Sequence, residues 1–104
     1  MFKNVQTAVD ESRQMYENPY WSPLAILAGI TEEVGELARL LNHLYGDKPK
    51  KLEESKQHLG EEIADVMYGC ICLANSQDID LDVEFKKALN KAQIRDKDRF
   101  VRKV

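Results

Sequence analysis

Apolar residues recur every three or four positions through most of this chain of 104 residues. That spacing places them on one face of an α-helix, and no stretch shows the strict alternation of a half-buried strand. The pattern predicts four helices, over residues 2–17, 23–43, from 52–55 to 75, and from 80 toward 99. We therefore expect an all-α fold, a compact bundle of about four helices built around the antiparallel second and third.

Local signals set the expected helix ends. Asn18-Pro19 should end the first helix, because proline disfavours helical geometry in the residue before it. Ser22 followed by Pro23 is typical of a helix start, with serine as the N-cap and proline at the first helical position. Asp78 or Asp80 should cap the last helix, whose apolar Val83, Phe85 and Leu89 are predicted to face inward.

Composition indicates an ordinary globular protein, with 43% hydrophobic and 32% charged residues. This length predicts a single domain over residues 1–104. No apolar run approaches the roughly 18 residues of a membrane span. The first residues lack the basic and then apolar plan of a signal peptide, so we expect a cytoplasmic protein without membrane contact.

Charge is distributed unevenly along the chain. Residues 86–104 carry eight basic and two acidic side chains, a balance of +6, whereas the rest carries seven basic and sixteen acidic, a balance of −9. A basic final segment could bind nucleic acid, or it could place cations beside a metal-bound polyphosphate. The acidic body would repel a nucleic-acid backbone, and the segment lacks interleaved stacking aromatics, so nucleic acid is disfavoured.

Two similar acidic stretches, TEEVGELARLLN and GEEIADVMYG, are the most informative part of the chain. Each contains a glutamate doublet, two further residues and another carboxylate: Glu32, Glu33 and Glu36 in the first, Glu61, Glu62 and Asp65 in the second. Residues three apart share one face of a helix. Glu33 and Glu36 therefore project together, as do Glu62 and Asp65.

An acidic cluster on a helix is most often a solvated face, but the neighbours of these acids are apolar. The interleaved residues are Val34, Leu37 and Leu41 in one stretch and Ile63, Val66 and Met67 in the other. Four helical glycines (Gly29, Gly35, Gly60 and Gly69) cost roughly 1 kcal/mol each relative to alanine, which indicates close approach of backbones or of a ligand. Opposed helices would bring four carboxylates together, and such a set needs a cation. Oxygen ligands favour Mg²⁺ or Mn²⁺ over zinc.

The order Glu33-x-x-Glu36 followed by Glu62-x-x-Asp65, within the words EEVGELA and EEIADV, resembles the MazG-type all-α nucleoside triphosphate pyrophosphohydrolases. The resemblance covers about residues 20–100. It implies Mg²⁺-dependent hydrolysis of (deoxy)nucleoside triphosphates to the monophosphate and pyrophosphate, a reaction suited to nucleotide-pool cleansing. It also implies a homodimer or homotetramer, with each site completed by a neighbouring chain.

Within this resemblance, Glu33, Glu36, Glu62 and Asp65 would hold the metal. Glu32 and Glu61 are both candidates for the general base or for support of the ligands. Trp21 is either a staple between the first two helices or an aromatic face for a nucleobase. Lys91, Arg95 and Arg99 form a stripe along the last helix, either solvated or binding phosphate.

Two other classes of function remain open. One is a non-catalytic helical interaction module, whose acids would only solvate its surface. The other is a nucleic-acid binder that uses the basic C-terminal helix. A di-iron bundle is disfavoured, because His43 and His58, expected at helix ends or on the surface, do not follow a glutamate at Glu-x-x-His spacing. Cys70 and Cys72 are expected to be buried thiols.

Overall fold

Four α-helices make up the regular structure of the chain in a computed structural model that describes residues 1–46 and 56–104. They are α1 (Phe2–Arg13), α2 (Pro23–Tyr45), α3 (Lys56–Ser76) and α4 (Leu81–Asp96). No strand occurs in the described ranges, which confirms the all-α prediction. The predicted start of the third helix, at residues 52–55, lies outside the described residues.

The local signals for helix starts are confirmed. The Ser22 hydroxyl accepts a hydrogen bond from the Ala25 backbone N–H at 3.3 Å, with Pro23 opening α2. The Asp80 carboxylate accepts from the backbone N–H groups of Asp82 and Val83 and so caps α4. Each cap satisfies backbone donors that have no partner within the helix.

The first helix is shorter than its apolar pattern predicts. It ends at Arg13 rather than at residue 17. The Nε of Arg13 donates to the Pro19 carbonyl oxygen at 2.8 Å, and the Tyr16 N–H donates to the Arg13 carbonyl oxygen at 3.0 Å. These bonds fold the chain back in a turn, which replaces the last predicted helical turn. The last helix likewise ends at Asp96 rather than near residue 99.

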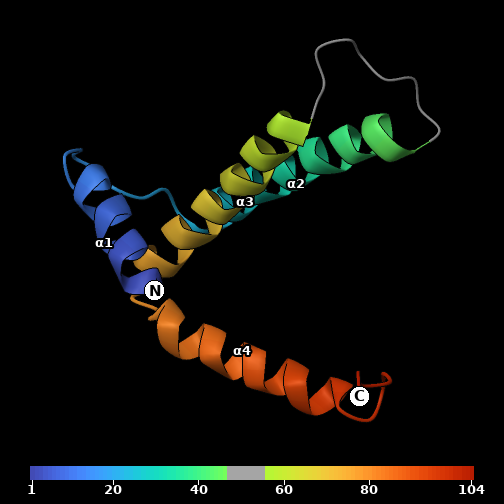
Figure 1. Ribbon diagram of the computed structural model, residues 1–104. Helices are drawn as coiled ribbons and strands as arrows, with labels where there is room; N and C mark the ends of the chain where they lie inside the picture. The colour runs from blue at the N-terminus through green and yellow to red at the C-terminus, as the bar shows by residue number, and fades with distance from the viewer. Residues whose placement is uncertain (47–55) are drawn as a thin grey trace.

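The core lies between α2 and α3, which run antiparallel along each other (Figure 1). Its most buried apolar side chains are Leu40, at 3% exposure, and Ala74, at 4%. A Cβ built at Gly69 would lie 2.7 Å from Cγ1 of Ile30, so only glycine permits this close approach of the two helices. A Cβ at any of the other three helical glycines would meet nothing within 4 Å, so the predicted close approach is found only at Gly69, where the neighbour is the Ile30 side chain.

His43 lies in the last turn of α2, which agrees with the expected helix end, but it is buried in this core and not exposed at the surface. Its Nδ1 lies 3.3 Å from an Nη of Arg39, one helical turn earlier. The α2 helix continues two residues beyond the predicted end at His43, to Tyr45. The histidine therefore sits within the last turns of the helix, where α3 can cover it.

A hydrogen-bond network around Asn75 joins α1 to the end of α3. The Nδ2 of Asn75 donates to the Gln6 carbonyl oxygen at 3.0 Å and to the Tyr20 hydroxyl at 3.1 Å, while its Oδ1 accepts from Nε2 of Gln6 at 3.0 Å. The Tyr20 hydroxyl in turn donates to Oδ1 of Asp10 at 2.6 Å. These bonds fix the connector between α1 and α2, which carries Tyr20 and Trp21.

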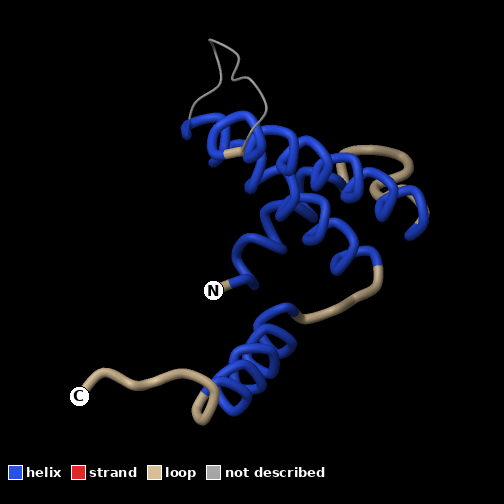
Figure 2. Tube along the Cα trace, turned by 90° about the vertical axis from the view of Figure 1, so that its right-hand side faces the viewer, coloured by secondary structure: helices blue, strands red, loops and turns tan. Residues whose placement is uncertain are grey.

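The last helix, α4, projects away from the other three helices, as both views show (Figures 1 and 2). Its first turn is attached to α1: the Asp82 carboxylate accepts from the backbone N–H groups of Phe2 and Lys3, and the Phe2 and Phe85 rings lie 5.1 Å apart. Val83, Phe85 and Leu89 are about half exposed, so the predicted inward face is wrong within the single chain. The reason is that α4 makes almost no contact with the α2–α3 pair.

The single chain is correspondingly open. Its radius of gyration is 17.2 Å, against about 13 Å for a compact domain of this length. The helix count is as predicted, but the chain alone is less compact than the expected bundle. Among the described helices, none has the length and apolar character needed to cross a membrane.

Candidate metal centre

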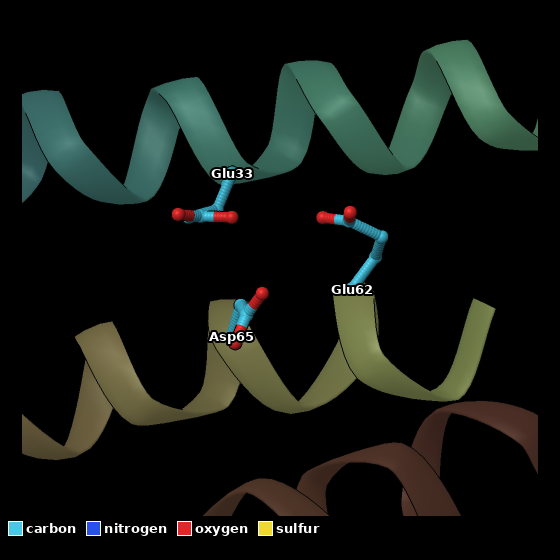
Figure 3. Close-up of side chains that lie close together, drawn as sticks. All are labelled: Glu33, Glu62 and Asp65. Atoms are coloured by element: carbon cyan, nitrogen blue, oxygen red, sulfur yellow. The ribbon is translucent and has the colours of Figure 1, made fainter. Parts of the chain in front are cut away.

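Three carboxylates meet between α2 and α3. Glu33 points from α2 toward Glu62 and Asp65 on α3 (Figure 3). One oxygen from each lies within 4.8 Å of the others. The geometry follows from the sequence, because Glu62 and Asp65 are one turn apart on one helix and the antiparallel partner presents Glu33 to them. The sequence prediction that the two acidic stretches converge is confirmed for these three residues.

Two oxygens of this cluster are buried without a hydrogen-bond partner in the described part of the chain. They are Oε2 of Glu33 and Oε2 of Glu62. A carboxylate oxygen removed from water without a compensating partner destabilises the folded state. Such an arrangement is therefore better matched to a bound cation than to an apo protein.

The pKa values of Glu33 and Glu62 also indicate that their charged forms are destabilised in the folded protein. Burial raises the pKa of Glu33, and repulsion from Glu36, Asp65 and Glu62 raises it further. Burial also raises the pKa of Glu62, with Glu36 and Asp65 adding to the effect and Arg39 opposing it. Glu36 thus lies close enough to act on both glutamates, although the three converging oxygens do not include its own.

The donor set fits a hard divalent cation. The converging ligands are carboxylate oxygens, which suit Mg²⁺ or Mn²⁺, and none of the three is a histidine or cysteine of the kind zinc prefers. A cation would supply a partner for the two buried oxygens and offset the mutual repulsion of the acids. Arg39, which sequence reasoning missed, follows Glu36 by three residues, and this one-turn spacing is the signal that could have identified it.

A pocket of about 230 Å³ adjoins the acids. Glu33 and Asp65 line one part of it, and its other lining residues are Arg13, Pro19, Tyr20, Trp21, Ala25, Ile26, Gly29, Ile30, Tyr68, Gly69 and Cys72. Trp21, singled out from the sequence, is 69% exposed and forms part of this wall. Arg13, Tyr20 and Tyr68 were missed, because no local spacing connects them to the acidic stretches.

Other predicted site residues lie away from this pocket. Lys91, Arg95 and Arg99 are exposed on or just after α4, and none of them lines it. Nε of Arg95 lies 2.9 Å from Oδ1 of Asp96, and the Arg99 guanidinium lies 5.6 Å from the centre of the Phe100 ring.

Glu32 and Glu61 are exposed and stand outside the cluster. Each precedes a cluster residue by one position, which turns its side chain by about 100° around the helix. The cysteines also differ from each other: Cys72 is buried and lines the pocket, whereas Cys70 is exposed, contrary to expectation. Burial raises the pKa of the Cys72 thiol, which keeps it protonated.

Fold and site together define an all-α protein with a carboxylate cluster that could hold a divalent cation, beside an aromatic pocket. Comparison with known proteins agrees. The MazG nucleotide pyrophosphohydrolase domain matches residues 21–100 of the chain. The chain therefore belongs to the MazG nucleotide pyrophosphohydrolase family.

Individual relatives extend the comparison beyond the matched region. The chain is 48% identical over 101 residues to the uncharacterized protein YpjD of Bacillus subtilis (strain 168), covering 97% of this chain and 91% of that protein. A crystal structure of B. subtilis YpjD, described as a candidate pyrophosphatase, superposes with a TM-score of 0.82 at 45% identity, over 88% of this chain and 93% of the other. A Bacillus-conserved MazG protein described as a nucleotide pyrophosphohydrolase gives a TM-score of 0.78 at 41% identity, over 94% and 95%.

Proposed function

We propose that this protein hydrolyses nucleoside triphosphates, including deoxynucleotides, to the monophosphate and pyrophosphate in the presence of Mg²⁺, with Mn²⁺ as a substitute. One observation carries the proposal: in the cluster that Glu33 and Glu62 form with Asp65 beside an aromatic pocket, two buried glutamate oxygens have no hydrogen-bond partner among the described residues. The activity named for the similar Bacillus MazG protein supports it. Cleansing of the cytoplasmic nucleotide pool is the role that we propose for this reaction.

Four carboxylates are the proposed metal ligands: Glu33, Glu36, Glu62 and Asp65. A bound Mg²⁺ would neutralise phosphate charge and lower the pKa of an attacking water. The chain's own contribution is to hold these oxygens in fixed positions on two packed helices, so that little reorganisation accompanies binding. Glu32 and Glu61 remain the proposed candidates for the general base or for supporting the ligands. Both face solvent at the rim of the cluster, where each could pass a proton to bulk water.

The aromatic wall suits the nucleobase. The Trp21 ring lines the pocket beside the acids and could stack on a planar base. The pocket volume of about 230 Å³ lies below the roughly 300–1,000 Å³ typical of whole drug-sized ligands, so part of the nucleotide would fill it. A triphosphate would then extend from the base in this pocket toward the carboxylates.

The basic stripe of α4 is proposed to serve phosphates in the site of a second copy. Lys91, Arg95 and Arg99 do not line the pocket of their own chain. Three large apolar side chains of α4, Phe85, Leu89 and Ile94, are more than half exposed, which favours a partner. A +6 segment next to a −9 body gives two copies complementary charge. We therefore propose a homodimer or homotetramer in which α4 of one copy covers another.

A substrate screen tests the activity. Canonical and damaged nucleoside triphosphates would be incubated with the protein in Mg²⁺ or in EDTA, and pyrophosphate and orthophosphate would be measured separately. We expect pyrophosphate only in Mg²⁺. Failure to hydrolyse any triphosphate, with no change of melting temperature at millimolar Mg²⁺, would reject the enzyme in favour of a helical interaction module.

A single substitution tests the basic stripe. Arg95→Ala should lower kcat/KM by an amount equivalent to about 1–3 kcal/mol of transition-state stabilisation, the range for charge-assisted hydrogen bonds. The affinity for Mg²⁺ should be unchanged. Lys87→Ala is the matched control, since Lys87 is an exposed cation of α4 that pairs with Glu84. If Arg95→Ala leaves hydrolysis intact but abolishes salt-sensitive oligonucleotide binding, the nucleic-acid role is correct instead.

A further inference from the structure

The pocket has two chemically different ends. Glu33 and Asp65 line it at the acidic cluster, and Arg13 lines it close enough to Cys72 to oppose the rise that burial causes in the pKa of that thiol. Asp65 and Cys72 are separated by about 10 Å along the axis of α3, at 1.5 Å per residue. The lining also includes small and apolar residues, among them Ala25, Ile26 and Gly29. Among the lining residues that the structure describes, Arg13 is the only one that carries a positive charge.

Arg13 is held in place by the turn that ends α1. Its Nε donates to the Pro19 carbonyl oxygen at 2.8 Å, which uses the donor nearest the chain. Its guanidinium carbon lies 5.0 Å from the centre of the Tyr16 ring, a cation–π distance. Burial raises the pKa of Tyr68, and the charge of Arg13 opposes that rise, which places the guanidinium next to the pocket wall. A rigid planar fork of N–H donors therefore borders the pocket.

An arginine offers only donors to whatever it meets. Its guanidinium has five N–H groups and no acceptor, and it stays charged at all physiological pH values. A carbonyl oxygen on the edge of a base can accept from it, whereas an exocyclic amino group would set donor against donor. Such a mismatch leaves polar groups unpaired in a partly closed site, and this kind of mismatch gives large discrimination between similar substrates.

We propose that Arg13 determines base specificity, selecting nucleobases that carry a carbonyl oxygen over those that carry an amino group at the same position. The inference rests on the proposed function, which places the phosphates at the acidic end and therefore the base at the Arg13 end. Arg13 lies on α1, which precedes residues 21–100, where the family domain matches.

Two matched substrate pairs test the inference. Inosine and adenosine triphosphates differ in a carbonyl or amino group at one ring position, and uridine and cytidine triphosphates differ in the same way. For each pair we expect kcat/KM to favour the carbonyl base by about 10- to 100-fold. Arg13→Gln should bring both ratios close to one, because a glutamine amide both donates and accepts. Lys3→Gln removes a cation from the exposed side of the same helix and should leave the ratios unchanged.

The outcomes separate this inference from the proposed function. If no triphosphate is hydrolysed, the proposed activity fails, and dissociation constants for the same four nucleotides in Mg²⁺ still measure selectivity. Equal handling of both members of each pair by the unmodified protein would overturn the role of Arg13. So would an Arg13→Gln variant that weakens all four nucleotides equally, since that result indicates a phosphate contact. Should Arg13→Gln fail to fold by circular dichroism, Arg13→Met replaces it, because methionine has no N–H donor, and a methionine variant that keeps the full ratios would also overturn the proposal.

Discussion

Two groups of polar side chains include residues of α3. The polar atoms of one group are paired in hydrogen bonds, whereas the other group contains a buried oxygen without a partner among the described residues. At Asn75 both the amide nitrogen and the amide oxygen have partners, in Gln6 and Tyr20. At Glu62, about 20 Å earlier along the helix axis, one carboxylate oxygen is buried with no partner in the described residues. Glu62 and Asn75 lie on the same helix and are both half-buried, so the difference lies in what surrounds them.

This difference separates a structural hydrogen-bond network from the proposed metal site. The Asn75 network satisfies its polar groups with bonds inside the chain, and each of those bonds joins a distant part of the sequence. The Glu62 cluster instead places acids beside each other, which raises the pKa of Glu62 and of Glu33. A protein gains nothing in stability from such repulsion without a cation, which supports the proposed metal site. The comparison predicts that substitutions at the two sites will have opposite effects on stability and function.

The largest expected effect is on turnover. Glu36→Gln and Asp65→Asn should each reduce kcat to below about 1% of the unmodified value, since loss of a partner behind the ligands already costs 10- to 100-fold in comparable sites. In EDTA the same variants should melt at an equal or higher temperature, because one charge is removed from a repelling set. Glu11→Gln, an exposed acid of α1, is the control. Activity near the unmodified level in both variants would show that these residues are not ligands.

At the other group the opposite pattern is expected. Asn75→Ala removes three hydrogen bonds and leaves partners on Gln6 and Tyr20 unsatisfied, which should cost about 2–4 kcal/mol in the free energy of unfolding. Mg²⁺ affinity of the folded variant should be unchanged. Urea denaturation and a calorimetric Mg²⁺ titration measure the two quantities. A variant as stable as the unmodified protein would remove the distinction between the two groups.

The sequence predicts one of these groups and not the other, for a physical reason. Glu33, Glu62 and Asp65 follow helical spacing within two local stretches, so their convergence required only that two helices pair. The start of α2 was equally local, because Ser22 and Pro23 are adjacent. Asn75 bonds to residues 55 and 69 positions away, and contacts at that separation leave no periodic signal.

The exposure of α4 and the early end of α1 could not be predicted either, because both depend on contacts that leave no periodic signal in the sequence. The apolar residues of α4 predicted an inward face, but a helical stripe does not say which chain covers it. The early end of α1 depends on the bond from Arg13 to the Pro19 carbonyl oxygen, which the apolar period cannot reveal. Tyr20 and Tyr68 entered the site only when the helices and the connector were placed in space.

A pH titration of stability sharpens the comparison at the acidic cluster. Because the pKa values of Glu33 and Glu62 are raised above 4.5 in the folded protein, the folded state binds protons more tightly there than the unfolded chain. In EDTA the melting temperature should therefore fall as the pH rises from about 4.5 through the raised pKa values. Millimolar Mg²⁺ should reduce or abolish that fall, because the cation takes the place of the protons. A melting temperature in EDTA that is flat or rising over this range would contradict the cluster's electrostatics.

The smallest expected effect tests the network through Tyr20. Tyr20→Phe keeps the ring in the pocket wall and removes the hydroxyl that bonds Asp10 and Asn75, which should cost about 1–2 kcal/mol in unfolding free energy. This loss of stability should become smaller at both low and high pH. The hydrogen bond from Tyr20 is the main cause that lowers the pKa of Asp10, so its stabilisation is lost as the pH falls below 3.8. Burial, with Asp10 adding, raises the pKa of Tyr20 to about 12, so the stabilisation is also lost as the pH rises from 10 through that value. The unmodified protein should melt at a higher temperature than Tyr20→Phe, by an amount that is constant between pH 3.8 and pH 10 and smaller outside that range. A difference in melting temperature that does not vary with pH would show that the hydrogen bond from the Tyr20 hydroxyl to Asp10 contributes nothing to stability.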